Sequence, residues 1–319
     1  MIKPIAIVAG EPNSINSEII AKAWNKIKNK KNLFIIGNYL LLKKQINKIN
    51  IKIKVYKITS VKDIKNNKRL NILNIPLNFK SLFKNNITDT KNYVLESLNT
   101  AHNLAFNRSI KGFINAPVNK NNFSDKYLGV TEYLANKNNA QNKEVMMIYN
   151  KKLAVIPLTT HLEIKEITNK INPSLIKRKI LTLNKSYYKL FKKKPKIAIL
   201  GLNPHNSEGR VNSIEEKIIK PTVKKLRKLN ININGPFPAD SVFNDQARVN
   251  YNVIVGMYHD QVLAPFKALY GYDAINITLG LKYLRISPDH GTAQNIIGQN
   301  KANPQSIISA INFLNKFHD

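Results

Sequence analysis

The sequence predicts an α/β protein built from two domains. Short apolar runs alternate along the chain with amphipathic stretches of helical period, the pattern of helices packed on largely parallel strands. A length of 319 residues is long for one hydrophobic core, so we expect two domains that flank a cleft. No repeat and no Pro- or Gly-rich linker interrupts this pattern.

Buried strands are predicted where a short apolar run ends in a polar or glycine-containing loop. These runs occupy residues 5–9, 33–36, 112–115, 153–158, 197–202 and 252–257. The segment 49–58 differs because apolar and polar residues alternate in it, as they do in an edge or half-exposed strand. Its lysines are interpreted as a solvated face.

Helices are predicted between these strands, where apolar residues recur with helical spacing. The segments are 17–29, 93–107, 174–192 and 214–229, with a C-terminal helix at 306–317. The alternation of strands and helices favours parallel sheets, whose ligands bind beyond the carboxyl ends of the strands.

The composition excludes several classes of site and leaves nucleic-acid binding open as an alternative. The chain contains no cysteine, which excludes disulfides, thiolate zinc sites and iron–sulfur clusters. No apolar run is long enough to cross a bilayer, and the run at 5–9 is too short for a signal peptide, so a cytoplasmic location is expected. The net charge of +32 is spread along the chain among many Ile and Asn, all residues with AT-rich codons. This favours compositional drift over specific nucleic-acid binding, which stays an alternative.

Three of the six histidines follow the predicted strands closely. His161, His205 and His259 come within a few residues of the ends of apolar runs. Each could simply cap its strand through a hydrogen bond. Because three imidazoles in parallel contexts could converge, and imidazole is a common ligand of divalent metals, we favour a metal site. Asp240 and Asp260, close to these histidines in sequence, are candidates for proton transfer or for orienting a ligand.

A second signal is the loop that runs from Asp289 to Ser306. The chain lacks both the G-x-G-x-x-G fingerprint and the phosphate-binding G-x-x-x-x-G-K-[ST] loop, so neither standard nucleotide motif applies. Gly291, followed by small residues, would let the backbone approach a ligand closely. From the residues alone, an ordinary loop that leads into a helix is an equal possibility.

Several motifs, in order and spacing, carry a resemblance that covers the chain from end to end. They are NAPVNK (115–120), TTHL (159–162), GLNPHNSEG (201–209), GPFPADSVF (235–243), YHDQVLAPFK (258–267) and NITLGLKYLRISPDHGTA (276–293). With the segment HGTA…IGQNKANP, which is similar to the cofactor loop of isocitrate and isopropylmalate dehydrogenases, the chain resembles the 4-hydroxythreonine-4-phosphate dehydrogenase family. The resemblance implies two α/β/α domains of the isocitrate/isopropylmalate dehydrogenase type.

The resemblance also implies a domain division, a reaction and a dimer. Residues 1–135 with 281–319 would form the cofactor-side domain, and 136–280 the metal- and substrate-binding domain with the dimer interface. The reaction would be the NAD(P)-dependent oxidation of 4-phosphooxy-L-threonine in pyridoxal phosphate synthesis. Its β-keto acid product would lose carbon dioxide to give 3-amino-2-oxopropyl phosphate. The partner would be a second copy of the chain, with no membrane and no specific nucleic acid.

The resemblance assigns individual residues to this site. His161, His205 and His259 would bind a divalent metal, with His259 reaching into the partner's site. Zinc is favoured, and magnesium or cobalt remain open. Substrate-binding positions match Thr131, Lys267, Asn276 and Arg285. Cofactor-binding positions match His290, Gly291, Thr292, Ala293 and Asn303, with NAD or NADP undecided.

Two positions depart from the family pattern. Val130 replaces a histidine that contacts substrate, so one hydrogen bond is lost. The glycine-rich N-terminal loop becomes GEPNSINSE (10–18), in which Asn16 could preserve a turn because asparagine tolerates left-handed backbone. Three alternatives stay open: a paralogue that oxidises another phosphorylated hydroxy acid, a relative with poor activity, and a basic nucleic-acid-binding protein.

Overall fold

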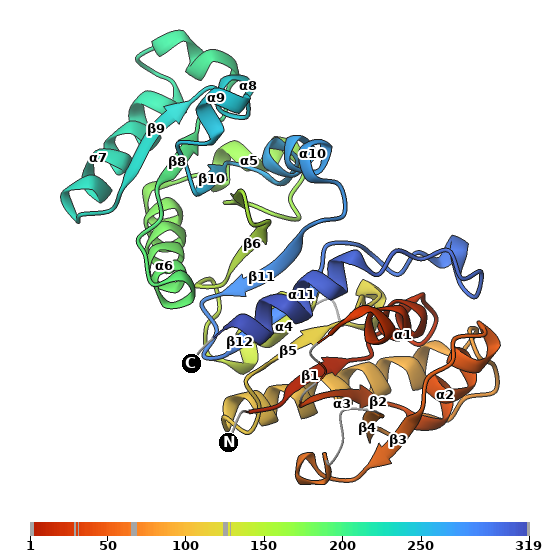
Figure 1. Cartoon of the computed structure of the whole chain (residues 1–319). Coiled ribbons are helices and arrows are strands. Elements are labelled where there is room, and N and C mark those ends of the chain that lie inside the picture. Colours follow the sequence, from red (N-terminus) through yellow and green to blue (C-terminus); the bar gives the residue numbers. More distant parts are fainter. Residues whose placement is uncertain are drawn as a thin grey trace. The chain divides into compact units, whose positions relative to one another are not determined.

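The computed structural model describes residues 3–28, 30, 32–64, 69–123, 127 and 129–317. The chain divides into two compact units, one formed by Met1–Asn138 with Leu281–Asp319 and the other by Asn139–Gly280 (Figure 1). Each unit is a sheet with helices packed against it. Among the described helices, none combines the length and apolar character needed to cross a bilayer.

The first unit is a parallel sheet. Its strands lie in the order β3 (Val55–Ile58), β4 (Leu70–Asn74), β2 (Leu33–Gly37), β1 (Ile5–Val8), β5 (Gly112–Asn115) and β12 (Leu284–Pro288). Its helices are α1 (Asn16–Lys26), α2 (Tyr39–Lys48), α3 (Ile87–Phe106), α4 (Val130–Lys137) and α11 (Gln305–Lys316), with 3₁₀ turns at Val61–Asp63, Lys120–Asn122 and Gln294–Ile296. The predicted strands at 5–9, 33–36 and 112–115 are confirmed.

One face of this sheet is closed by helix α3. Ala6, Val8, Phe34 and Phe113 on the strands pack against an apolar stripe of α3 that includes Val94 and Leu98. Helix α3 begins at Ile87, earlier than predicted, because Asn86 caps it by accepting a hydrogen bond from the backbone N–H of Asp89 at 3.1 Å. The buried face of the helix runs from Thr90 to Ala105.

Two predictions for the first unit need correction. The alternating segment 49–58 forms a strand only at its end, β3, which is indeed the edge of the sheet. The helix predicted at 17–29 is α1, which ends at Lys26, while Asn29 lies outside the described residues. Strands β4 and β12 and helices α2 and α4 were not predicted, because their apolar residues are too few or too irregular to show a clear period.

The second unit is a mixed sheet. Its strands lie in the order β11 (Ile275–Leu279), β6 (Val145–Tyr149), β7 (Ala154–Pro157), β10 (Val253–Gly256), β8 (Ile197–Leu200) and β9 (Ile233–Phe237). Strands β7, β10, β8 and β9 are parallel, whereas β6 is antiparallel to both of its neighbours. The predicted strands at 153–158, 197–202 and 252–257 are confirmed as β7, β8 and β10.

The helices of the second unit include two long amphipathic ones. Helix α6 (Pro173–Phe191) matches the predicted 174–192, and the predicted 214–229 is a π-helical turn (Glu215–Ile219) followed by α7 (Lys220–Lys228). The others are α5 (Ile164–Lys170), α8 (Ala239–Val242), α9 (Asp245–Arg248) and α10 (His259–Tyr270), with a short turn at Pro204–Gly209. Helix α10 was not predicted because Pro265 lies inside it.

Candidate active site

The three candidate metal ligands follow three neighbouring parallel strands of the second unit. Strand β10 lies between β7 and β8, and all three run in the same direction. His161 follows β7, His259 is the first residue of α10 directly after β10, and His205 lies in the turn after β8. The histidines therefore emerge from the same edge of one sheet, where the carboxyl ends of parallel strands meet.

Two of these histidines lie together in the chain. The ring centroids of His161 and His259 are 6.3 Å apart. His205 is exposed on its turn, and within the described part of the chain no three His, Asp or Glu side chains form a group that could hold a metal ion. A single chain thus brings His161 and His259 together but does not gather all three.

The surroundings of His259 suit a metal ligand. Its Nδ1 lies 2.6 Å from Oδ1 of Asp260, a hydrogen bond that leaves Nε2 available for coordination. Carboxylates in this position orient ligand imidazoles and raise their basicity. Asp240, the other candidate for proton transfer or orientation, is exposed in α8. The donor set therefore fits a divalent metal, with Asp260 beside one ligand.

Sequence reasoning missed Glu215, which lies behind His205. Its side chain is fully buried at the start of the π-helical turn and accepts hydrogen bonds from the residues that flank His205. Burial raises the pKa of the Glu215 carboxyl, but hydrogen bonds from Asn203 and Ser207 outweigh this and hold the pKa below its usual value. The signal in the sequence was weak, because Glu215 is one of two adjacent glutamates.

In the first unit, two predicted substrate residues meet although they are far apart in sequence. The guanidinium of Arg285 is buried and donates to Oδ1 of Asn115 at 2.5 Å and to Oγ1 of Thr131 at 3.2 Å. Burial lowers the pKa of Arg285 to about 10, although Tyr283 and Glu132 oppose that shift. A positive side chain beside the first turn of α4 makes this site suited to an anion.

The other two predicted substrate residues lie in the second unit. Lys267 is exposed on α10. Asn276 lies on β11, where its Oδ1 is buried and has no hydrogen-bond partner among the residues that the structure describes. Buried polar atoms are normally satisfied, so this oxygen is available for a donor from a ligand.

The predicted cofactor loop is held against helix α1. Glu18 accepts from the backbone N–H of Ala302 at 2.6 Å, and Lys22 donates to the carbonyls of Asn300 and Ala302 at 2.9 and 3.0 Å. The carbonyl of Thr292 accepts from the backbone N–H of Ile15 at 3.3 Å. Two ends of the loop are therefore fastened to the N-terminal segment.

The predicted cofactor residues occupy different parts of this loop. Nδ1 of His290 lies 3.0 Å from the carbonyl of Gly291, and Oδ1 of Asn303 accepts from the backbone N–H of Gln305 at 2.9 Å. A Cβ on Gly291 would meet no atom of the described residues within 4 Å, so none of their contacts requires a glycine there. Left-handed backbone in the loop is instead found at Ala293, Gly298 and Asn300, with φ of 46°, 73° and 57°.

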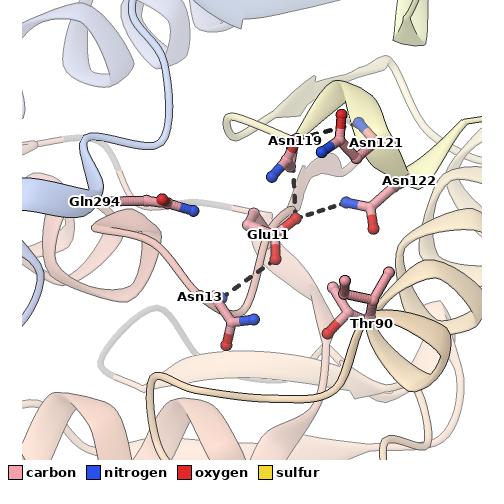
Figure 2. Close-up of a pocket in the computed structure, with 8 residues that line it drawn as sticks. Glu11, Asn13, Thr90, Asn119, Asn121, Asn122 and Gln294 are labelled. Carbon is pink, nitrogen blue, oxygen red and sulfur yellow. Dashed lines mark hydrogen bonds between the residues drawn. The ribbon is translucent and has the colours of Figure 1, made fainter.

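A cavity lined mainly by polar residues adjoins the loop at Gln294. It has a volume of about 220 Å³ and is lined by Glu11, Asn13, Ile87, Thr90, Asn119, Asn121, Asn122 and Gln294 (Figure 2). Figure 2 shows the carboxylate of Glu11 between Asn13 and the Asn119–Asn122 segment, where Asn122 donates to it at 2.6 Å. Burial raises the pKa of Glu11, although these hydrogen bonds oppose the shift.

The N-terminal loop departs from what the sequence suggested. Asn16 is not in a left-handed turn, so that prediction is wrong; it is the first residue of α1. Its side-chain amide donates to the carbonyls of Ala9 at 2.9 Å and Pro117 at 2.8 Å, which ties the loop to the end of β5. Gly10 carries the positive φ instead, and a Cβ there would lie 2.6 Å from the carbonyl oxygen of Pro117.

Comparisons with known proteins agree with this architecture. The family model described as "Pyridoxal phosphate biosynthetic protein PdxA" matches residues 29–314. The chain is 35% identical to the 4-hydroxythreonine-4-phosphate dehydrogenase of Sulfurihydrogenibium sp. over 319 residues, which cover 98% of this chain and 97% of the relative. The crystal structure of the 4-hydroxythreonine-4-phosphate dehydrogenase from Klebsiella pneumoniae superposes with a TM-score of 0.85 at 28% identity, covering 98% of both chains.

A more distant similarity bears on the fold alone. The β-decarboxylating dehydrogenase of Thermococcus kodakarensis matches with a TM-score of 0.52 at 10% identity, over 98% of this chain and 84% of the other. The predicted fold class, α/β of the isocitrate/isopropylmalate dehydrogenase type, is confirmed. Because the family model and a full-length relative above 30% identity both match, the chain belongs to the pyridoxal phosphate biosynthetic protein PdxA family.

Proposed function

We propose that the chain is an NAD(P)-dependent dehydrogenase that oxidises 4-phosphooxy-L-threonine in pyridoxal phosphate synthesis. The observation that carries this proposal is the hydrogen bond of 3.2 Å between Arg285 and Thr131, two residues that the resemblance matches to substrate-binding positions in distant parts of the sequence. A buried guanidinium beside a hydroxyl at the start of a helix is suited to an anionic substrate. The product, a β-keto acid, loses carbon dioxide to give 3-amino-2-oxopropyl phosphate.

Each unit supplies a different part of the chemistry in this proposal. In the first unit Arg285 and Thr131 bind the substrate, and the loop with His290, Gly291, Thr292, Ala293 and Asn303 binds the dinucleotide. In the second unit Lys267 donates to an anionic group of the substrate, and Oδ1 of Asn276 accepts a hydrogen bond from it. When bound, the dinucleotide would supply the hydride acceptor for this oxidation.

His161, His205 and His259 hold the divalent metal in this proposal. When bound, the metal lowers the pKa of the substrate hydroxyl and stabilises the negative charge that develops on its oxygen. Asp260 keeps the His259 ring in the orientation and tautomer that present Nε2, because its carboxylate binds Nδ1. The three imidazoles favour zinc, and cobalt or magnesium remain to be compared by experiment.

The proposal is tested by following the reduced dinucleotide with purified protein and 4-phosphooxy-L-threonine. We expect turnover with NAD or NADP that a chelator removes and added metal restores. Metal content is then measured for His161→Ala, His205→Ala and His259→Ala, each of which is expected to lose metal. Turnover that resists exhaustive chelation, or wild-type metal content in any one variant, would contradict the corresponding assignment.

The proposal includes a homodimer whose sites are shared between subunits. The resemblance assigns His259 to the partner's site, whereas in the chain itself His259 lies beside His161. In this proposal the third imidazole comes from a second subunit, and the crossing residue is either His259 or His205. The cytoplasmic location expected from the sequence stays a prediction.

A further inference from the structure

His205 lies in a turn whose backbone is left-handed over four successive residues. His205, Asn206, Ser207 and Glu208 have φ between 48° and 54° and ψ between 24° and 42°. None of them is glycine, the residue that adopts left-handed backbone without a steric cost. The turn Pro204–Gly209 therefore depends on contacts that hold it in place.

Glu215 supplies contacts on both sides of His205. One carboxylate oxygen, Oε1, accepts from the backbone N–H groups of Leu202 and Asn203, each at 2.9 Å. The other, Oε2, accepts from the hydroxyl of Ser207 at 2.9 Å. Only an ionised carboxylate can accept all of these bonds without donating one, so the residue type matches its surroundings.

Three further hydrogen bonds, made by Asn206 and Gln261, hold the turn and the strand ends beside it. Asn206 donates to the carbonyl of Pro236 at 3.0 Å. Gln261 donates to the carbonyl of Gly201 at 2.7 Å and accepts from the backbone N–H of Met257 at 2.7 Å. Gln261 thus joins the end of β8, before His205, to the end of β10, before His259.

We propose that Glu215 is a positioning residue that holds the Pro204–Gly209 turn in its left-handed conformation and so presents His205 to a divalent metal ion. This inference rests on the proposed function, because that function makes His205 a ligand. The role of Glu215 in holding the turn does not depend on the proposed function. The buried carboxylate contacts the residues around His205 and does not touch His205 itself. Loss of such outer contacts weakens metal affinity by roughly 10–100-fold in other metal sites.

The chain provides a matched control in the adjacent residue. Glu216 is partly exposed and forms an ion pair with Lys220, on the solvent side of the same helix. Zinc affinity of the metal-free full chain is measured by competition with a chromophoric chelator. We expect roughly 10–100-fold weaker binding in Glu215→Ala, partial rescue in Glu215→Gln, which keeps one acceptor oxygen, and wild-type binding in Glu216→Ala.

A second readout separates positioning from a general loss of structure. Hydrogen exchange of the backbone amides at 202–209 should accelerate in Glu215→Ala and not in Glu216→Ala, whereas dinucleotide binding, assigned to the first unit, should stay unchanged.

If Glu215→Ala does not fold, Ser207→Ala carries the test: it removes one bond to the carboxylate and should weaken zinc binding several-fold. Wild-type zinc affinity and exchange in these variants would overturn the inference. A wild-type chain that binds no zinc would instead overturn the proposed function.

Discussion

At the scale of single residues, the buried guanidinium of Arg285 is the group on which substrate recognition is expected to depend most. It is 3% exposed and reaches two acceptors, Asn115 and Thr131, from one planar group. A lysine keeps the charge but presents a single ammonium group, which cannot reproduce this fork. Replacing Arg285 with lysine therefore keeps the positive charge but loses the hydrogen-bond geometry expected for substrate recognition.

Arg285→Lys should therefore lower kcat/KM for 4-phosphooxy-L-threonine by roughly 10–100-fold. The loss of one charge-assisted hydrogen bond costs about 1.5–3 kcal/mol, and most of it should appear in KM. Steady-state kinetics of both proteins measure the effect, with Arg227→Lys on exposed α7 as the control. Unchanged kinetics in Arg285→Lys would remove Arg285 from the substrate site.

Val130 is the position at which the chain breaks the family pattern of its substrate site. It is the first residue of α4 and packs, partly buried, against the apolar cluster of the first unit. The adjacent Thr131 contacts Arg285. A histidine at 130 could add a hydrogen bond or a charge where valine offers only apolar contact.

We expect Val130→His to raise kcat/KM for 4-phosphooxy-L-threonine by up to ~tenfold, about 1.4 kcal/mol, chiefly through a lower KM. Both constants are measured for both proteins, and the thermal midpoint reports the cost of placing an imidazole against the apolar cluster. A histidine variant that is worse with this substrate would favour a reshaped pocket. The paralogue that oxidises another phosphorylated hydroxy acid would then replace the proposed function.

At the scale of secondary-structure elements, a buried histidine links α3 to the segment that enters β12. Nδ1 of His102 lies 2.8 Å from the hydroxyl of Tyr283, which also accepts from the side chain of Asn138 at 3.0 Å. Burial lowers the pKa of His102 below 6.5, and the charge of Lys137 lowers it further. The folded chain therefore binds a proton at this site less readily than the unfolded chain.

This shift predicts a stability that falls in mild acid. At and below the unfolded pKa of about 6.5 the unfolded state takes up more protons, so the contribution is full above that pH and is lost as the pH falls toward the lower folded value. His102→Gln, which cannot titrate, should flatten the dependence of the unfolding free energy on pH between about pH 5 and 7. Denaturant unfolding across this range measures it. An equal slope in wild type and His102→Gln would exclude this role.

At the scale of the whole molecule, the proposed dimer decides which histidines complete one site. If His259 crosses to the partner, mixing inactive His161→Ala and His259→Ala chains should restore part of the activity, since one hybrid site regains all three ligands. If His205 crosses instead, that mixture stays inactive, and the pair that complements is His161→Ala with His205→Ala. Activity after verified subunit exchange distinguishes the two. No recovery in either mixture would contradict a site shared between subunits.

The sequence by itself determined the fold class and the family. The alternation of apolar runs and amphipathic stretches depends on local periodicity, which is why strands β1, β2, β5, β7, β8 and β10 were predicted. The histidines at strand ends were visible for the same reason, because the end of an apolar run marks the edge of a sheet. The motifs around them identified the family, and the family model and full-length relative agree.

Only the tertiary structure decided which of these residues meet. The hydrogen bond between Thr131 on α4 and Arg285 on β12 joins positions that no local period relates. Arg285 also reaches Asn115 because β12 lies beside β5 in the sheet. The left-handed turn around His205 is likewise invisible in the sequence, since none of its four left-handed residues is a glycine and the buried carboxylate of Glu215 holds it from outside. Asn16 was misjudged for the same reason. Its conformation is set by carbonyl groups at Ala9 and Pro117, and a local preference cannot report contacts that long-range folding creates.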